Sequence, residues 1–558
     1  MTLASRVLAR VYRLSPALTH DIEVERGIPV TMPDGVVLLA DRLAARGRTD
    51  LPTILIRTPY GRRSLTSWMI GTRLLAERGF NVVVQSCRGT DGSGGVLDPF
   101  RTEKEDGLAT VAWLRRQSWY SGRFATYGPS YLGIVQWAIA QDAGTELKAI
   151  APLIAPSNMG AFITQGGGFQ LEVMLWWTCV MKNGHARVPS SLHRVGAWLS
   201  QLKGLALQRN ELAAFERFLP VSGLDVATTG STIQWWQDWT GRSAADEWWS
   251  RIDFRSGIEK VGAPACMVAG WDDIFLVQQI GDFERLSASG RKPQLLIGPW
   301  DHVMSWPGPA LRESLAWFRA HLLDDPKDLR AKPVRLYVMG ANEWRDYEAW
   351  PPVDAPPMKW HLQPNGALGV AEPAESAPDR YLYDPSNPTP SLGGKTIVGK
   401  RGRAEMGRIE RRSDIVCYTS EPLASDLEVI GPISAELFVA SSGRCVDFVV
   451  HLCDVDAAGR SMSVCEGFTR IDVNEVDKFV ERSPVHIQLA PTAYRFKRGH
   501  RLRVHVASGA HPRYARNLGL SQAVASGIEY SSSWQTIFHD PIRPSAIVLP
   551  VSSMPKGR

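Results

Sequence analysis

One serine stands among glycines in Gly128-Pro129-Ser130-Tyr131-Leu132-Gly133, directly after the strand-like segment Phe124-Ala125-Thr126-Tyr127. Small residues around a serine at a sharp strand-to-helix turn relieve crowding and leave the hydroxyl exposed for attack on a carbonyl carbon. The general G-x-S-x-G pattern is met only in part, because Leu132 takes the place of its second glycine and Gly133 comes one residue later. Taken alone, the stretch predicts either a hydrolase nucleophile or an ordinary turn.

A serine nucleophile needs a histidine as base and a carboxylate to orient that histidine. Two later segments offer both, each after a strand-like run: Gly270-Trp271-Asp272-Asp273 and Gly298-Pro299-Trp300-Asp301-His302. Ligands bind at the carboxyl ends of strands in open α/β sheets, and the order serine, aspartate, histidine is that of α/β hydrolases. We therefore predict Ser130 as nucleophile and His302 as base. The residues alone leave Asp272 and Asp273 open as the acid, and Asp301 could instead cap the following turn.

Acyl transfer also needs hydrogen-bond donors for the oxyanion that forms on the carbonyl. The Tyr131 amide follows the nucleophile and opens a predicted helix, where amides lack partners within the helix. The segment Thr58-Pro59-Tyr60-Gly61-Arg62 follows another strand-like run and offers the Tyr60 hydroxyl. We predict Tyr60 and Tyr131 as the two donors, with packing of Tyr60 beside the turn as the alternative.

The elements that must position these residues alternate along the chain. Apolar strands are predicted at 53–57, 81–85, 124–127, 148–153, 263–269 and 293–297, with helices at 68–77, 103–116 and 310–323. This pattern is typical of a parallel sheet. A hairpin that turns at Pro33-Asp34-Gly35 supplies two edge strands. Between 156 and 255 the strand signals vanish and tryptophans gather, either to line a cavity or to fill a core.

The C-terminal part has a different character. From about residue 331, alternating strands punctuated by proline and glycine follow one another, at 334–338, 433–439, 446–452 and 502–507. Such a run predicts an antiparallel β domain with almost no helix.

Composition narrows the class of protein. The chain has 558 residues, 44% hydrophobic and 22% charged, which indicates a globular protein of two or three domains. The net charge of +6 is small for this length and no basic stripe is interleaved with aromatics, so nucleic acid is not an expected partner. No apolar run is long enough for a membrane span. The seven cysteines form no CxxC pair and are predicted to be buried free thiols.

The first twenty residues carry Arg6, Arg10 and Arg13 among aliphatic side chains, without the apolar core of a secretory signal. They predict a basic amphipathic helix. It could pack on the body of the protein, contact a membrane surface or serve as an organelle transit peptide. A cytoplasmic enzyme is favoured.

The catalytic segments together resemble the cocaine esterase family, which is related to X-prolyl dipeptidyl aminopeptidases and α-amino acid ester hydrolases. The resemblance rests on the serine, aspartate and histidine segments above and on Arg57-Thr58-Pro59-Tyr60-Gly61. It continues in the β region through Tyr383-Asp384-Pro385, Gly393-Gly394, Ser420-Glu421-Pro422-Leu423, Gly431-Pro432, Val446-Asp447-Phe448 and His511-Pro512 with Asn517. It covers nearly everything after residue 22.

The resemblance implies an α/β-hydrolase domain in two parts, 1–155 and 256–330, an inserted helical cap at 156–255 and a C-terminal jelly-roll β domain at 331–558. It implies Ser130 as nucleophile, Asp273 as acid and His302 as base, with the Tyr60 hydroxyl and the Tyr131 amide as oxyanion hole, and neither cofactor nor metal. It selects Asp273 because the family's triad aspartate stands three residues after the loop glycine. The displaced Gly133 is the normal form in that family.

In one segment that bears on substrate choice, the sequence differs from the related amino acid ester hydrolases. The amino acid ester hydrolases carry acidic residues after the triad aspartate, whereas Ile274-Phe275-Leu276 follow here. Glu172 or Asp238 could substitute as anchors for an ammonium group, although both are expected to be solvated.

We predict a serine hydrolase that cleaves a small-molecule carboxylic ester, or an amide, through an acyl-enzyme. The protein could also form a homo-oligomer. The alternatives are an X-prolyl dipeptidyl aminopeptidase and a catalytically inactive protein that binds carbohydrate or a partner.

Overall fold

The computed structural model describes residues 2–183, 215, 217–352, 355–472 and 483–552. These residues fall into two compact units. The first contains 2–162 and 247–334, and the second contains 163–183, the described part of 202–246, and 335–552. The finer division predicted from the sequence, at 155, 255 and 330, stays a prediction.

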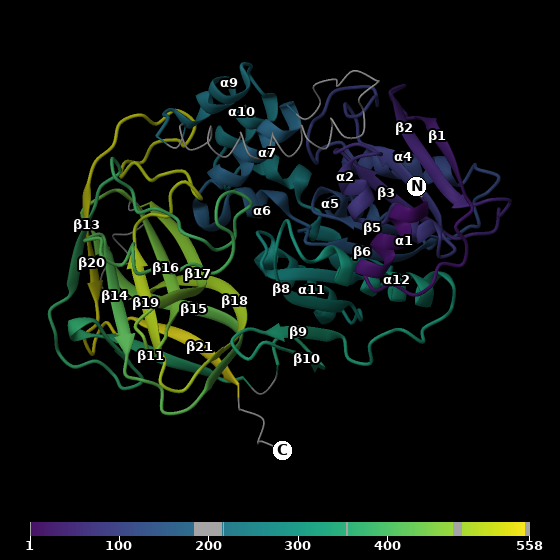
Figure 1. Ribbon diagram of the computed structural model, residues 1–558. Helices are drawn as coiled ribbons and strands as arrows, with labels where there is room; N and C mark the ends of the chain where they lie inside the picture. Colours follow the sequence, from purple (N-terminus) through teal and green to yellow (C-terminus); the bar gives the residue numbers. More distant parts are fainter. Residues whose placement is uncertain (1, 184–214, 216, 353–354, 473–482, 553–558) are drawn as a thin grey trace. The chain divides into compact units, whose positions relative to one another are not determined.

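The first unit is built on a mixed β-sheet with a parallel centre (Figure 1). Its strands lie in the order β1 (Ile22–Thr31), β2 (Val37–Ala45), β4 (Asn81–Ser86), β3 (Thr53–Thr58), β5 (Phe124–Pro129), β6 (Leu147–Leu153), β7 (Cys266–Asp272) and β8 (Gln294–Asp301). The pairings from β4 to β8 are parallel, and the β1–β2 hairpin adds to β4 in antiparallel fashion. Every residue of β3, β4 and β5 is buried, as expected for a parallel sheet covered on both faces. The predicted strands are confirmed.

The helices of this unit are α1 (Thr2–Val11), α2 (Leu65–Met69), α3 (Thr72–Ala76), α4 (Glu103–Leu114), α5 (Tyr131–Ala140), α11 (Leu276–Ala288) and α12 (Pro307–Leu322). Helix α5 packs on β5 and β6, α11 on β7, and α12 on β5, β6 and β7. The predicted helices at 103–116 and 310–323 correspond to α4 and α12.

Two details of the predicted topology are wrong. The expected single helix at 68–77 is divided, because Gly71 takes a left-handed φ of 77° between α2 and α3. A Cβ at this glycine would lie 2.6 Å from Leu311 of α12, so close packing requires glycine there. The hairpin supplies only one edge strand, since β2 pairs with β4 as well as with β1.

Between β6 and β7 the described residues form the helices α6 (Met159–Ile163), α7 (Leu171–Asn183), α9 (Leu224–Thr229) and α10 (Gln234–Thr240). Their tryptophans fill a core in the second unit. Trp236 and Trp239 are 0% and 1% exposed, and the Trp177 ring lies 6.0 Å from that of Trp239. The core-filling interpretation is confirmed for these three residues, whereas Trp198 lies outside the described residues.

The rest of the second unit is built mainly from β-strands. They are β9 (Val334–Val338), β10 (Glu343–Tyr347), β11 (Pro357–Gln363), β12 (Ala367–Gly369), β13 (Asp379–Tyr383), β14 (Ile415–Ser420), β15 (Leu427–Ser441), β16 (Cys445–Val455), β17 (Ser461–Asp472), β18 (Val485–Phe496), β19 (Arg501–Ala507), β20 (Ser533–Phe538) and β21 (Ala546–Ser552). Strands β11 to β21 share one sheet, in the order β13-β20-β15-β18-β17-β16-β19-β14-β12-β11-β21.

Because β21 also pairs with β15, the strands from β15 to β21 in this order close into a barrel (Figure 1). The pairings are antiparallel except for β12 with β14. The predicted antiparallel β domain is therefore confirmed.

None of the seven cysteines forms a disulfide, and five of them are buried. Burial raises the pKa of the Cys266 thiol above its ordinary value, so this side chain packs as a small apolar group and not as a nucleophile. In the described part of the chain, no helix has both the length and the hydropathy needed to cross a membrane.

Candidate active site

Ser130 lies at the turn between β5 and α5 in a strained backbone conformation. Its φ of 54° and ψ of −126° are rarely adopted by a residue with a side chain. The Ser130 amide donates a hydrogen bond to the carbonyl oxygen of Leu153 on β6, at 2.9 Å. The surrounding sheet thus holds the serine at the carboxyl ends of its strands, as in a nucleophile elbow.

Two glycines make this turn sterically possible. Gly128 has a φ of 145°, and a Cβ there would lie 2.5 Å from the Cβ of Leu132. A Cβ at Gly133 would lie 2.3 Å from the Cβ of Ala155, in the segment that follows β6. Any larger residue at position 133 would push α5 away from the sheet. The displaced glycine of the sequence therefore has a physical reason, which is the close approach of α5 to residue 155.

His302 bridges Ser130 and Asp273. Its Nε2 lies 3.0 Å from Ser130 Oγ, and its Nδ1 lies 2.7 Å from Asp273 Oδ2. With the proton on Nδ1 donated to Asp273, Nε2 can accept the hydroxyl proton of Ser130. The structure brings these three predicted residues together.

The Asp273 carboxylate is completely buried, at 0% exposure, and both of its oxygens have partners. The Phe275 amide donates to Oδ1 at 2.7 Å, while Oδ2 faces His302. The Phe275 ring stands edge-on to the His302 ring, with centroids 5.2 Å apart, and against Phe162 at 4.6 Å. Phe275 therefore holds the carboxylate through its backbone and covers one side of the imidazole with its ring.

The other two aspartates near His302 have different surroundings. Asp301 Oδ1 accepts hydrogen bonds from the amides of Val303 and Met304 at 2.7 and 2.9 Å, so it caps the turn after β8. Asp272 ends β7 and is in register with Asp301 on β8. The two strands thus extend through Asp272 and Asp301, whereas the sequence pattern predicts loops there.

Trp300 fixes the segment that carries His302. Its Nε1 donates to the carbonyl of Ala269 on β7 at 2.8 Å. A Cβ at Gly270 would lie 2.1 Å from the Trp300 carbonyl oxygen, and one at Gly298 would lie 2.2 Å from its ring. The two glycines therefore make room for this tryptophan between β7 and β8. This role was not predicted from the sequence. The signal for it was that a tryptophan follows a glycine closely in both segments, Gly270-Trp271 and Gly298-Pro299-Trp300.

Tyr131 directly follows Ser130, and its ring packs against that of Tyr60 in a T-shaped arrangement with centroids 6.5 Å apart. The buried Tyr131 hydroxyl donates to Glu103 at 2.7 Å and accepts from the Phe100 amide at 3.1 Å. Tyr60 is half-buried, and its amide donates to Thr58 Oγ1 at 3.1 Å. The Tyr131 phenol is thus held by Glu103 and Phe100, and the roles of the Tyr60 hydroxyl and the Tyr131 amide as oxyanion donors stay predictions.

A buried ion pair contacts the Tyr131 hydroxyl through Glu103. Arg57 of β3 and Glu103 of α4 lie 2.8 Å apart with side chains 1% and 2% exposed. Burial opposes the charge of Arg57, but the Glu103 carboxylate raises the pKa of Arg57 above its ordinary value. Because Glu103 also accepts the Tyr131 hydroxyl, the pair connects β3, α4 and α5. Sequence reasoning missed it, although a charge inside an apolar strand was a usable signal.

A further buried carboxyl, that of Asp282, lies where the chain leaves β6. Asp282 of α11 is 1% exposed and accepts hydrogen bonds from the amide of Ser157, at 2.8 Å, and from its hydroxyl. The carbonyl of Ser157 accepts the Phe254 amide at 2.9 Å, so the two ends of the segment between β6 and β7 are joined here. Burial raises the pKa of Asp282 to about 7, although the Ser157 hydrogen bonds act in the opposite direction.

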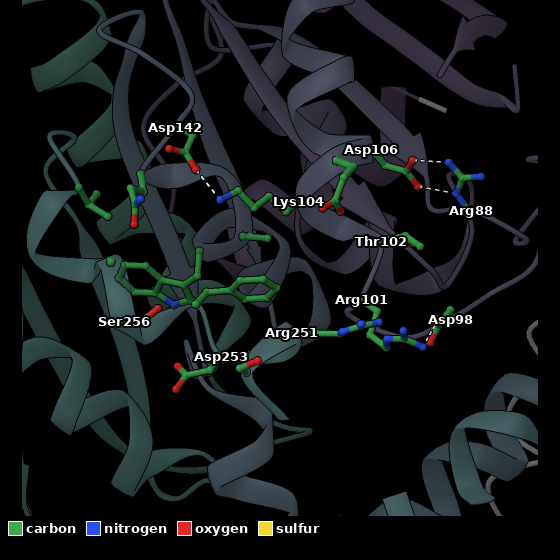
Figure 2. Close-up of a pocket in the computed structure, with 18 of the residues that line it drawn as sticks. Arg88, Asp98, Arg101, Thr102, Lys104, Asp106, Asp142, Arg251, Asp253 and Ser256 are labelled. Carbon is green, nitrogen blue, oxygen red and sulfur yellow. Dashed lines mark hydrogen bonds and ion pairs between the residues drawn. The ribbon is translucent and has the colours of Figure 1, made fainter. Parts of the chain in front are cut away.

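A cavity of about 660 Å³ opens elsewhere in the first unit, lined by α4, the C-terminal half of α5 and residues 250–261 (Figure 2). Its lining does not include Ser130, Asp273 or His302. Most of its charged side chains pair with one another, in the ion pairs Lys104–Asp142, Arg88–Asp106 and Arg101–Asp98, at 2.6 to 2.8 Å. These groups stabilise the surface of the unit and give no reason to place the chemistry there.

The two alternative anchors for an ammonium group already have partners in the second unit. Glu172 accepts a hydrogen bond from Thr396 at 2.7 Å, and Asp238 lies 3.3 Å from Arg242. Both are half-buried. The expected solvation is therefore partial, because each carboxylate has a side-chain partner and keeps part of its surface exposed.

Comparisons with known proteins agree with this fold. Residues 34–304 match the family described as X-Pro dipeptidyl-peptidase (S15 family), and residues 329–547 match its C-terminal non-catalytic domain. The chain is similar to an aminopeptidase from a marine sediment Thaumarchaeota archaeon, with a TM-score of 0.80, 22% identity and 96% and 97% of the two chains covered. It is also similar to an α-amino acid ester hydrolase, with a TM-score of 0.78, 20% identity and 96% and 98% covered. These two likenesses concern the fold.

The fold and the family matches define a serine hydrolase. The chain is 30% identical to cocaine esterase from Rhodococcus sp. (strain MB1 Bresler), over 95% of this chain and 98% of that protein. It therefore belongs to the cocaine esterase family, and the resemblance noted in the sequence is confirmed.

The Gly133 contact predicts a cost for a single added methyl group. Gly133→Ala should lower the free energy of unfolding by about 1–3 kcal/mol, because the methyl would overlap Ala155. Gly281→Ala on α11 is the matched control, since nothing lies within 4 Å of its Cβ position. It should be neutral or stabilise by up to about 1 kcal/mol through helix propensity. Urea denaturation followed by circular dichroism measures both, and equal stabilities would contradict the packing argument.

The Asp282 carboxyl predicts a pH dependence of stability. Its pKa is about 7 in the folded chain against an ordinary value of 3.8, so it favours the fold below about pH 4 and this contribution is lost as the pH rises towards 7. In Asp282→Asn this titration is absent. The wild type should therefore lose about 1–4 kcal/mol relative to the variant between pH 4 and 8. Unfolding curves at several pH values test this, and parallel profiles would count against it.

Proposed function

We propose that the protein hydrolyses carboxylic esters of small molecules through an acyl-enzyme, with Ser130 as nucleophile, His302 as base and Asp273 as acid. The observation that carries this proposal is the continuous hydrogen-bonded series from Ser130 Oγ through both nitrogens of His302 to Asp273. Membership of the cocaine esterase family supports the same reaction class.

In the first half-reaction, Ser130 Oγ attacks the ester carbonyl while His302 Nε2 takes the hydroxyl proton. Asp273 keeps the imidazole oriented and stabilises its positive charge. The Tyr131 amide and the Tyr60 hydroxyl donate hydrogen bonds to the oxyanion of the tetrahedral intermediate. His302 then passes the proton to the departing alcohol, which leaves the acyl group on Ser130.

In the second half-reaction, His302 takes a proton from a water molecule, and the resulting hydroxide attacks the acyl carbon. The carboxylic acid leaves as Ser130 recovers its proton from His302. The proton transfers need no group beyond Ser130, His302, Asp273 and water, so we propose no cofactor for this reaction.

Apolar residues beside the triad favour a substrate without a free amino group. Ile274, Phe275 and Leu276 are 5%, 4% and 0% exposed in the place where amino acid ester hydrolases are expected to carry acids. An ammonium group brought there would lose its water without gaining a carboxylate partner. Glu172 and Asp238 already bind Thr396 and Arg242. An X-prolyl dipeptidyl aminopeptidase is the second candidate, favoured by the name of the matching family.

We also propose the finer domain organisation. It consists of an α/β-hydrolase domain at 1–155 and 256–330, a helical cap at 156–255 and a jelly-roll β domain at 331–558. The parallel sheet, the helices between β6 and β7 and the closed antiparallel barrel support this division. The other alternative from the sequence is a catalytically inactive binding protein. It does not suit a serine hydrolase in which Ser130 Oγ lies within hydrogen-bond distance of His302.

Purified protein should turn over a p-nitrophenyl acyl ester and react with a fluorophosphonate probe at Ser130. Ser130→Ala should lower kcat/KM at least about 1,000-fold and abolish labelling, because the nucleophile is gone. Ser121→Ala removes an exposed serine of the same unit and should leave both unchanged. Labelling that survives Ser130→Ala would refute the assignment, and exclusive turnover of a Gly-Pro anilide would establish the dipeptidyl peptidase instead.

Asn variants of Asp273 and Asp301 distinguish the proposed triad acid from an aspartate that only caps a turn. Asp273→Asn should lower kcat by about 1,000- to 10,000-fold, because the amide favours the wrong histidine tautomer. Asp301→Asn keeps an oxygen for the amides of Val303 and Met304, so kcat should change by less than about fivefold. Steady-state kinetics on the same ester compare the two variants. A larger loss in Asp301→Asn would reverse the roles assigned here.

A further inference from the structure

Helix α1 exposes apolar side chains to solvent. Leu3, Val7 and Val11 are 74%, 54% and 68% exposed, and their spacing of four residues places them on one face. The opposite face attaches the helix to the first unit through Ser5, which donates to Glu77 at 2.8 Å, and through the buried Leu8. The predicted amphipathic helix thus packs on the body, but its aliphatic stripe faces away from it.

Three arginines, Arg6, Arg10 and Arg13, accompany this stripe. In the part of the chain that the structure describes, none of them has an ion-pair partner. Residues 2–20 contain these three arginines and no aspartate or glutamate, which amounts to half of the chain's net charge of +6. An occupant of this face must therefore be acidic and must also accept aliphatic side chains.

The anchoring of α1 keeps its exposed face fixed on the first unit. The Tyr12 hydroxyl donates to the carbonyl of Met69 on α2 at 3.0 Å, and Arg312 of α12 donates to the Tyr12 carbonyl. Trp68, the neighbour of Met69, is 48% exposed. An exposed tryptophan in the segment to which Tyr12 is anchored suits the boundary between lipid headgroups and acyl chains.

We propose that α1 docks the protein on the surface of a membrane that contains anionic phospholipid. The aliphatic stripe forms a ridge that can enter the headgroup region, and the arginine stems are long enough to place their charges at the phosphates. A second copy of the chain fits less well, because it would bring one set of unpaired arginines against another. This contact is independent of the hydrolytic reaction proposed above.

Co-sedimentation with lipid vesicles tests the proposal on the full chain. Wild-type protein should sediment with vesicles of phosphatidylcholine and phosphatidylglycerol mixed at about two to one, and not with pure phosphatidylcholine. Salt should release it, since the charge term is screened. Arg6→Gln/Arg10→Gln and Val7→Ser/Val11→Ser should each lower the partition coefficient at least about tenfold, through loss of charge and of apolar insertion respectively.

Matched controls change similar residues away from α1. Arg26→Gln/Arg116→Gln removes two exposed arginines of the same unit, and Val96→Ser alters a valine that is 80% exposed. Both controls should bind vesicles like the wild type, and all variants should keep its thermal unfolding midpoint. No sedimentation with anionic vesicles, or equal losses in variants and controls, would overturn the proposal. A concentration-dependent dimer on size exclusion that only the α1 variants lose would replace it with self-association.

Discussion

The close approach of α5 to the sheet at the end of β5 is the constraint on which the rest of the site depends. Ser130 can hold its strained φ of 54° only while its amide is bound to Leu153 and the helix behind it stays near β6. Gly133 allows this, because a Cβ there would overlap Ala155. If α5 moved outward, Ser130 Oγ would leave His302 Nε2, which lies 3.0 Å away.

Two carboxylates near this turn, those of Asp273 and Glu103, are buried, and each has hydrogen-bond or ion-pair partners. Asp273 is held by His302 and the Phe275 amide, and Glu103 is held by Arg57 and Tyr131. An unpaired carboxylate in such a place would cost several kcal/mol, so each set of partners also determines where its strands and helices meet. The apolar Phe275 ring packs edge-on against His302 beside this buried carboxylate.

The two compact units contain different parts of the protein. The first contains the sheet, Ser130, His302, Asp273 and α1, whose arginines and aliphatic residues face solvent. The second contains the closed barrel and the helices α7, α9 and α10, whose core includes Trp177, Trp236 and Trp239. A rigid sheet positions a reactive group more precisely than loops alone can do, since buried strands leave little freedom to the residues at their ends. The contacts of Trp300 between β7 and β8 illustrate this, because they fix the segment just before His302.

Local patterns and chain order were enough to predict the central strands and the class of hydrolase. They also predicted Ser130 and His302 as nucleophile and base, and the structure places Ser130 Oγ 3.0 Å from His302 Nε2. The sequence left the choice between Asp272 and Asp273 to the family resemblance, and it misplaced the ends of β7 and β8. Only the tertiary structure showed that Phe275 holds Asp273, that Asp301 caps a turn and that Trp300 requires Gly270 and Gly298. These contacts join residues far apart in the chain, and a pattern of neighbours in sequence does not record which distant side chain fills a given space.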